Sequence, residues 1–180
     1  GMSRRWVDRG LMGFADLMLS VPQILIVVFL QAIFGKSGYL SLALSIGVTG
    51  WMAMARIIRN EVRRIREADY VTAARMMGGS FGYILRKHLL PGFLPAVLYA
   101  AVSSIGAAMM TEATLSFMGL GLPVADVSWG SLLSDSQNAL LSGSWWIILI
   151  PGIVLIGTLI AIAALGKQVR KGNTRLHSNL

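Results

Sequence analysis

Four long apolar stretches restrict what this chain can fold into more than any other feature of its sequence. They cover residues 11–34, 39–58, 93–118 and 145–165. The hydrocarbon core of a bilayer is about 30 Å thick, so a helix rising about 1.5 Å per residue needs about 20 residues to cross it. None of the four alternates like a barrel strand, and a helix satisfies its own backbone in lipid. The sequence therefore predicts an all-α, polytopic transmembrane helix bundle with four spans, the first interrupted by Asp16 and Pro22.

The composition excludes several other classes of protein. Apolar residues make up 55% of the chain and charged residues 13%, about half the proportion of roughly 25% found in soluble domains. A disordered chain, a coiled coil and most soluble enzymes are therefore ruled out. The chain has no cysteine, which excludes disulfides, thiol catalysis and cysteine-based zinc sites. We expect no catalytic residue, no metal site and no cofactor.

One short segment resembles the end of a phosphate-binding loop but lacks the rest of that motif. Gly35, Lys36 and Ser37 follow one another, yet Leu30 stands where the required first glycine would be. The glycine-rich backbone that cradles phosphates is therefore missing. We expect no ATP site in this chain.

The basic residues predict the topology. The chain has 16 Lys and Arg residues against 8 Asp and Glu residues. The five segments before, between and after the four stretches carry 3, 1, 8, 0 and 4 Lys or Arg residues in chain order, with Arg56 counted in the third segment. Solvated basic faces would show no such alternation, whereas cytoplasmic segments of membrane proteins are enriched in Lys and Arg. This pattern places the N-terminal segment 1–10, the loop 59–91 and the tail 166–180 in the cytoplasm. Residues 35–38 and 119–144 are then external, and nucleic acid is not an expected partner.

The loop 59–91 contains a short predicted helix. Asp69 can cap a helix that begins at Tyr70, and Gly78 with Gly79 can end it, because glycine adopts the left-handed backbone found at helix C-termini. Spacings of three and four put one set of residues on a single face, where the two alanines would let another surface approach. That set is Tyr70, Ala73, Ala74 and Met77.

A second helix is predicted directly after the first. Ser80 can cap a helix that runs from Phe81 to about Leu90, and Pro91 and Pro95 indicate a turn back into the membrane. The pattern alone leaves two roles open for such a loop. It fits an interfacial helix lying on lipid and also a docking helix that enters a groove on a cytoplasmic partner. In the outer loop, another short helix is predicted over residues 131–141.

The same loop resembles the EAA loop of ABC-importer permeases. That pattern is Glu-Ala-Ala, three residues, Gly, and later Ile-x-Leu-Pro; here Ala73, Ala74 and Gly78 keep the spacing, while Thr72 and His88 replace the glutamate and the isoleucine. The resemblance implies that the loop is a coupling helix moved by an ATPase. The residues it implicates are Tyr70, Thr72, Ala73, Ala74, Arg75, Met77, Gly78, Leu90 and Pro91.

The resemblance continues outside the loop and points to the dipeptide/oligopeptide/nickel branch of these permeases. It is carried by residues 55–62, 111–121 and 128–134, and by Trp6, Val7, Asp8, Met12 and Asp16. It implies the fold of a type I ABC importer permease. Such permeases usually have six spans, and this chain begins where the third would, so the first two spans are expected to be missing.

The resemblance implies a transport subunit without its own ATP site in a bacterial-type inner membrane. Its implied partners are a second permease subunit, two ATP-binding subunits and an external solute-binding protein, and its cargo is peptides, nickel or other small solutes. Asp16, Glu112 and Ser116 are candidates for a gate or translocation path, because ionisable groups within spans are often functional. The alternative is an ion-coupled carrier or intramembrane enzyme, which would need paired acids, whereas the topology puts Asp16 and Glu112 toward opposite faces.

Overall fold

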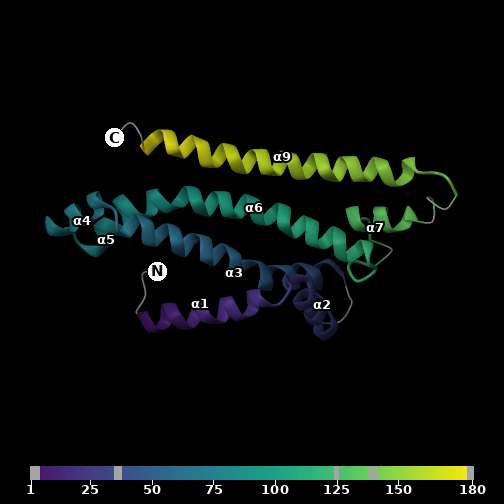
Figure 1. Cartoon of the computed structure of the whole chain (residues 1–180), viewed down its shortest axis with the longest axis horizontal. Helices are drawn as coiled ribbons and strands as arrows, with labels where there is room; N and C mark the ends of the chain where they lie inside the picture. Colours follow the sequence, from purple (N-terminus) through teal and green to yellow (C-terminus); the bar gives the residue numbers. More distant parts are fainter. Residues whose placement is uncertain (1–4, 35–37, 124–125, 138, 140–141, 178–180) are drawn as a thin grey trace. The chain divides into compact units, whose positions relative to one another are not determined.

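The computed structural model describes residues 5–34, 38–123, 126–137, 139 and 142–177, with side chains from residue 6 to residue 169. Every regular element in this part of the chain is helical, which confirms the predicted fold class (Figure 1). The elements are α1 (Arg5–Ser20), α2 (Gln23–Phe34), α3 (Gly38–Arg66), α4 (Asp69–Met76), α5 (Phe81–Ile84), the π-helix η1 (Leu85–Leu89), α6 (Leu90–Phe117), α7 (Trp129–Asp135) and α9 (Trp146–His177).

Within the described residues, three helical stretches are long and apolar enough to cross a membrane. They cover Gly38–Arg66, Phe81–Phe117 and Trp146–Val169, and they contain most of the second, third and fourth predicted spans. The interruption predicted within residues 11–34 is present at Pro22, where α1 and α2 meet at an angle of 93°. Pro22 lies at this break; it has no N–H to donate and disfavours helical backbone at the residue before it. The first predicted span is therefore a bent helix pair.

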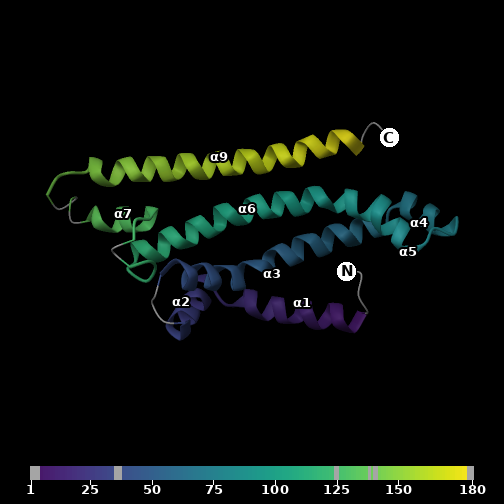
Figure 2. The same cartoon turned by 180° about the vertical axis from the view of Figure 1, so that it is seen from behind.

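The turn predicted at Pro91 and Pro95 is absent. The chain passes from α5 through the π-helical turn η1 directly into α6, and both prolines lie within that helical path. Pro91 cannot donate a backbone hydrogen bond, and the wider turn before it changes the bonding register without interrupting the helix. In Figure 2, α4 and α5 are short helices at the connection between α3 and α6.

The chain forms two compact units, and α3, α6 and α9 each contribute residues to both. The α4 unit comprises Gly1–Leu19, Met52–Val102 and Leu165–Leu180, within which residues 1–4 and 178–180 lie outside the described part. The α7 unit comprises Ser20–Trp51 and Ser103–Ala164. Each unit has its own buried cluster of apolar side chains.

The core of the α4 unit lies beneath the short helices. Its buried residues are Ile65, Val71, Ile84 and Leu89. Gly92 on α6 faces α3 so closely that an added Cβ would come within 3.0 Å of Ile65 Cδ1. The core therefore joins α4 to the ends of both long helices.

The core of the α7 unit combines an apolar cluster with buried hydroxyl groups. The apolar residues are Val27, Leu42, Leu115 and Leu122. On α3, the Ser45 hydroxyl donates to the Ser41 carbonyl at 2.8 Å and the Thr49 hydroxyl donates to the Ser45 carbonyl at 3.1 Å. These groups thus find acceptors on their own helix, as a hydroxyl in an apolar environment must.

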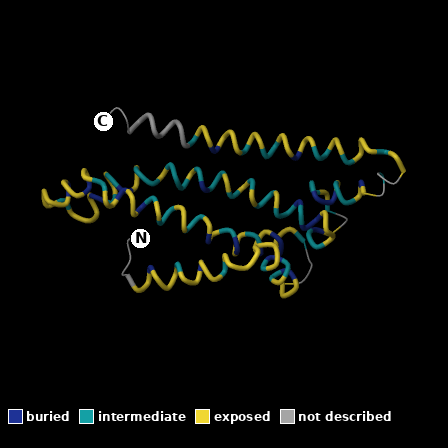
Figure 3. Tube along the Cα trace, in the orientation of Figure 1, coloured by how far each residue is buried: buried dark blue, intermediate teal, exposed yellow. Residues whose placement is uncertain are grey.

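Exposed apolar side chains recur along α1 and α9 (Figure 3). On α1 they include Trp6, Leu11, Phe14 and Leu17, and on α9 they include Ile150, Ile153 and Ile160. Large apolar surfaces of this kind mark a membrane or protein interface rather than a face directed to water.

Residues 119–144 also contain a helix, at a different position from the one predicted. The prediction placed it at residues 131–141, but α7 begins at Trp129 and ends at Asp135. Ser128 is the capping residue: its hydroxyl accepts from the Ser131 N–H at 3.1 Å, and the Ser131 hydroxyl accepts from the Ser128 N–H at 2.8 Å. This reciprocal capping box fixes the earlier start. Residues 138, 140 and 141 of the predicted helix lie outside the described part.

Candidate functional site

The helix α4 begins one residue before its predicted start. Ala68, rather than Asp69, is the capping residue, with extended backbone angles and a carbonyl that accepts from Val71 N at 3.0 Å and Thr72 N at 3.1 Å. Asp69 is therefore the first helical residue, where its negative charge still faces the positive end of the helix dipole. The predicted side-chain cap is wrong, but the helix it was meant to start is present.

The C-terminal end of α4 confirms the role predicted for the two glycines. The Gly79 N–H donates to the Ala74 carbonyl at 3.0 Å and the Gly78 N–H donates to the Arg75 carbonyl at 3.1 Å, which is the Schellman arrangement. Gly78 has φ of 82°, in the region that side chains rarely adopt. A Cβ on Gly79 would lie 2.7 Å from the Ala74 carbonyl oxygen. Both glycines are needed, the first for its backbone angle and the second for space.

The predicted contact face of α4 is divided between two environments. Ala74, with 7% exposure, is buried with Val71 inside the unit, whereas Tyr70 and Ala73 are exposed. Met77 is 81% exposed. The expectation that both alanines would be presented to another surface is therefore wrong for Ala74, which anchors the helix to its own core.

The remaining predicted loop residues are on the surface. Thr72, Arg75, Gly78, Leu90 and Pro91 are all exposed. The loop thus presents an outer surface that is partly apolar and partly cationic. Such a surface can pack into a groove on a partner, and methionine adapts well to such contacts because its side chain is unbranched and polarisable.

The segment after α4 packs against it through aromatic rings. Ser80 caps α5 as predicted, accepting from the Tyr83 N–H at 3.3 Å. The His88 ring lies 5.8 Å from the ring of Tyr70 on α4 and 5.8 Å from that of Tyr83 on α5. Sequence reasoning missed this cluster because the π-helical turn that places His88 cannot be recognised from residue spacing.

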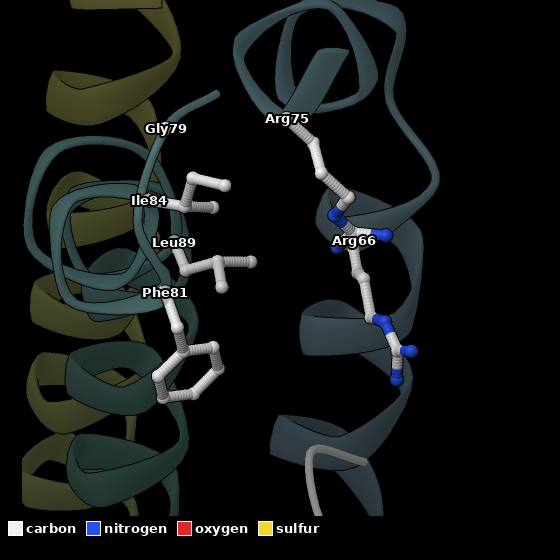
Figure 4. Close-up of a pocket in the computed structure, with 6 residues that line it drawn as sticks. All are labelled: Arg66, Arg75, Gly79, Phe81, Ile84 and Leu89. Atoms are coloured by element: carbon white, nitrogen blue, oxygen red, sulfur yellow. The ribbon is translucent and has the colours of Figure 1, made fainter. Parts of the chain in front are cut away.

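A pocket of about 290 Å³ lies beside the short helices. Arg66 and Arg75 lie along one side of it, and Phe81, Ile84 and Leu89 lie along the other (Figure 4). The pocket thus combines two guanidinium groups with an apolar wall.

Ion pairs connect α1 to the end of α3. The Asp8 carboxylate accepts two hydrogen bonds from Arg59, at 2.9 and 2.6 Å, and one from Arg63 at 2.8 Å. Asp16, a predicted gate candidate, pairs with Arg56 in an exposed position. Neither set of ion pairs was predicted. The sequence does carry a signal for them, because Asp8 and Asp16 lie on the same side of α1, and the arginines that they contact recur at spacings of three and four on α3.

The other two gate candidates form one hydrogen-bonded group in the α7 unit. The Ser116 hydroxyl donates to Glu112 Oε1 at 2.8 Å and accepts from the Leu122 N–H at 3.1 Å. Gly121 and Gly130 pack closely around this serine: a Cβ would lie 2.2 Å from Ser116 Oγ at Gly121, and 2.6 Å from Ser116 Cβ at Gly130. Ser116 therefore joins the end of α6 to the loop that follows it and to α7.

Glu112 also lines a cavity of about 450 Å³ whose remaining walls are largely apolar. The other lining residues are Tyr39, Leu42, Ala43, Ile46, Gly47, Ala108, Met109 and Leu122. In the described part of the chain, Glu112 has the Ser116 hydroxyl as a partner and forms no ion pair. A carboxylate in such surroundings can accept hydrogen bonds from a polar or cationic group that enters the cavity.

Comparison with known proteins gives a consistent result. The family described as binding-protein-dependent transport system inner membrane component matches residues 1–171. The dipeptide transport system permease protein DppC of Bacillus subtilis (strain 168) is 33% identical over 160 residues, covering 89% of this chain and 50% of DppC. The oligopeptide transport system permease protein OppC of the same organism is 32% identical over 163 residues, covering 91% of this chain and 53% of OppC.

The same fold occurs among solved structures. An inward-facing conformation of the MetNI methionine ABC transporter matches with a TM-score of 0.73 and 21% identity, covering 96% of this chain and 78% of that chain. By its sequence, the chain spans about half the length of the curated relatives it matches.

Proposed function

Because the chain belongs to the family of binding-protein-dependent transport system inner membrane components, we propose that it is a permease subunit of an ATP-driven ABC importer. The family consists of transport components rather than enzymes, and together with the apolar helices it makes the chain an integral membrane protein. The proposed cargo is peptides, because relatives such as DppC and OppC are peptide permeases; nickel or another small solute is the alternative cargo.

The observation that carries the coupling role is the anchored but exposed helix α4. Its inner side holds two buried residues, Ala74 and Val71, and Val71 belongs to the core that includes Ile65 of α3 and Leu89 of η1. Its outer side presents Tyr70, Ala73 and Met77. A force applied to the outer side therefore reaches both long helices through close-packed side chains, which resist compression.

We place the ATP-binding subunits against this outer side. The proposed assembly has two such subunits, a second permease subunit and an external solute-binding protein, in a bacterial inner membrane. In this arrangement residues 1–10, the loop 59–91 and the tail 166–180 are cytoplasmic, residues 119–144 are external, and residues 11–165 form the transmembrane domain. Closure of the ATPases would rock the spans between inward- and outward-open states.

Within the membrane, Glu112 and Ser116 are the proposed contacts for passing substrate. Their support is the cavity that Glu112 lines and the hydrogen bond that holds its carboxylate in place. Asp16 is the weaker candidate, since Arg56 already pairs with its carboxylate.

Co-purification tests the proposed function directly. The permease carrying this chain is affinity-purified from membranes that contain the products of its neighbouring genes, and ATPase subunits are expected to accompany it. Absence of any ATPase would instead support an ion-coupled carrier or an intramembrane enzyme.

A second experiment tests the role of α4. Ala73→Asp places a charge on the exposed side without disturbing the core, so the complex should assemble and hydrolyse ATP while substrate uptake falls by about tenfold or more, the effect of losing about 1.4 kcal/mol of coupling. Ala73→Ser, which adds only a small neutral hydroxyl at the same position, is the matched control and should transport normally. Unchanged uptake in Ala73→Asp would contradict the coupling assignment.

A further inference from the structure

Glu112 is the single charged group among the described residues that line the cavity of about 450 Å³ in the α7 unit. The Ser116 hydroxyl donates to Glu112 Oε1 at 2.8 Å, and Oε2 has no hydrogen-bond partner within the described residues. A carboxylate can accept about four hydrogen bonds, so most of its capacity is unused. Apart from Tyr39, the other described lining residues have no side-chain donor. The cavity therefore combines one strong acceptor with apolar surroundings.

The α7 unit has little positive charge of its own to balance this carboxylate. Residues 20–51 and 103–164, which form the unit, contain one basic residue, Lys36, and it lies outside the described part of the chain. The acidic residues of the unit are Glu112, Asp126 and Asp135. A carboxylate in apolar surroundings is costly unless a donor or an opposite charge accompanies it. A ligand that brings its own cationic group would therefore be held at Glu112.

Small residues on both helices leave the space beside Glu112 open. Ala43 and Gly47 of α3 and Ala108 of α6 line the cavity, and a Cβ added to Gly47 would meet no atom within 4 Å. The volume lies in the range of about 300–1,000 Å³ that is typical of small-molecule sites. Tyr39 supplies a hydroxyl that can donate to a carbonyl oxygen. The cavity thus has room for a cationic group with an apolar side chain and a carbonyl close to it.

A membrane span of a second permease subunit is the competing occupant, because small residues also let helices approach one another closely. A helix, however, uses its backbone N–H groups within itself and would bring none of them to Glu112 Oε2. A ligand with an ammonium group supplies the missing donors directly. The free acceptor at Glu112 therefore favours such a ligand.

We propose that this cavity recognises the amino-terminal end of a peptide, with the α-ammonium group on Glu112 and the first side chain against the apolar wall. The inference rests on the peptide-permease role proposed above, and it names the end of the cargo that Glu112 contacts. A lysine side chain carries the same ammonium group at the end of a flexible chain, away from the peptide backbone. The amino-terminal residue alone joins the ammonium group directly to its own side chain and carbonyl.

The experiment measures photocrosslinking of peptides to the permease that carries this chain, purified in detergent. The probes are leucyl-alanyl-alanine with a diazirine on the leucine side chain and the N-acetylated form of the same peptide. Labelled residues are located by mass spectrometry at peptide concentrations below saturation. We expect the free peptide to label residues such as Leu42, Ile46 and Met109 about tenfold more strongly than the acetylated one, the usual effect of losing one charge-assisted hydrogen bond. Equal labelling by the two peptides would overturn the assignment.

Two variants test the cavity from different sides. Glu112→Gln keeps an oxygen for the Ser116 hydroxyl but loses the charge, so labelling by the free peptide should fall about tenfold, to the level of the acetylated one. Asp135→Asn, which removes another charge of the same unit outside this cavity, is its control and should label normally. Gly47→Leu fills the cavity and should suppress labelling by both peptides. Gly50→Leu is its control on the same helix, because an added Cβ there also meets no atom within 4 Å.

The remaining arms exclude other sources of the effect. N-acetyl-leucyl-lysine with the same diazirine has its only ammonium group on the lysine side chain, and strong labelling by it would overturn the assignment to the amino-terminal end. Lys36→Gln should label normally, whereas increased labelling would mean that Lys36 occupies Glu112 in the unliganded chain. If Gly47→Leu instead prevents a second permease subunit from co-purifying, the cavity takes a span of that subunit. Co-purification of ATPase subunits tests the transport role separately, so the proposed site can fail while that role stands.

Discussion

The α4 unit and the α7 unit are stabilised by different kinds of polar contact. In the α4 unit, carboxylates and guanidinium groups join helices far apart in sequence, as Asp8 does with Arg59 and Arg63. In the α7 unit, hydroxyl groups bond to nearby backbone, as at Ser45 and Ser116. Charge pairs are suited to surfaces that water reaches, whereas neutral hydroxyls cost less to bury in an apolar region.

The largest effect is expected where backbone approaches backbone in the α7 unit. Gly130→Val would place a Cβ 2.4 Å from the Ala113 carbonyl oxygen, so α7 must move away from α6. We expect a loss of roughly 3 kcal/mol of stability, at the upper end for overpacked sites. Thermal unfolding in detergent measures it. Gly157→Ala on α9, where no atom lies within 4 Å of an added Cβ, is the control and should be neutral or slightly stabilising.

A smaller loss is expected at Ser116. Ser116→Ala removes the acceptor for the Leu122 N–H and the donor to Glu112, and leaves a buried N–H without a partner. The expected cost is about 2 kcal/mol. Ser116→Thr keeps the hydroxyl but adds a methyl group beside Gly121, so chemical denaturation can separate hydrogen bonding from crowding. If Ser116→Ala is as stable as the unaltered chain, hydroxyl groups do not hold this unit together.

In the α4 unit, Gly78→Ala should cost about 1 kcal/mol, because alanine must adopt the left-handed backbone that Gly78 has. Hydrogen exchange at the Gly79 and Gly78 amides should speed up, since these close the end of α4. Gly82→Ala, where nothing lies within 4 Å of the new Cβ and φ is ordinary, is the matched control. Equal exchange in the two variants would show that the end of α4 does not depend on the glycine.

The smallest effects are expected at the ion pairs. Asp8→Asn keeps an oxygen that can accept from Arg59 but loses the charge, so it should lower the unfolding temperature modestly. Asp16→Asn should lower it less, because its pair with Arg56 is exposed to solvent while the Asp8 side chain is only 8% exposed. Adding salt should narrow the difference between Asp16→Asn and the unaltered chain. If Asp16→Asn lowered the unfolding temperature more than Asp8→Asn does, burial would not determine how much these ion pairs stabilise the protein.

The features predictable from sequence are those set by neighbouring residues. Gly78 and Gly79 end α4 and Ser80 starts α5 because each acts within one turn of itself. The four apolar stretches likewise predicted helices from length alone. Of the candidate site, sequence spacing located the loop and placed Glu112 one turn from Ser116, which is the distance their hydrogen bond needs.

The features that could not be predicted depend on long-range contacts or on rare backbone. Asp8 and Arg59 are 51 positions apart, and nothing in either segment alone indicates the other. Ala74 is buried on the same helix as Val71, which packs with Ile84 and Leu89, and helical periodicity does not reveal that burial. Pro22 signalled an interruption but not a 93° bend.

The π-helical turn Leu85–Leu89 has a consequence for how this protein can diverge in sequence. Because an α-helix advances by 3.6 residues per turn, each residue added to or removed from it rotates everything downstream by about 100°. The extra residue held in this turn therefore sets which side of α6 is directed to each neighbour, while leaving the loop before it intact. Deleting one residue here would turn the whole following span about its own axis and would also displace His88 and Leu89, which contact Tyr70 and the core beneath α4. The orientation of α6 and the position of α4 therefore depend on the same turn and must change together.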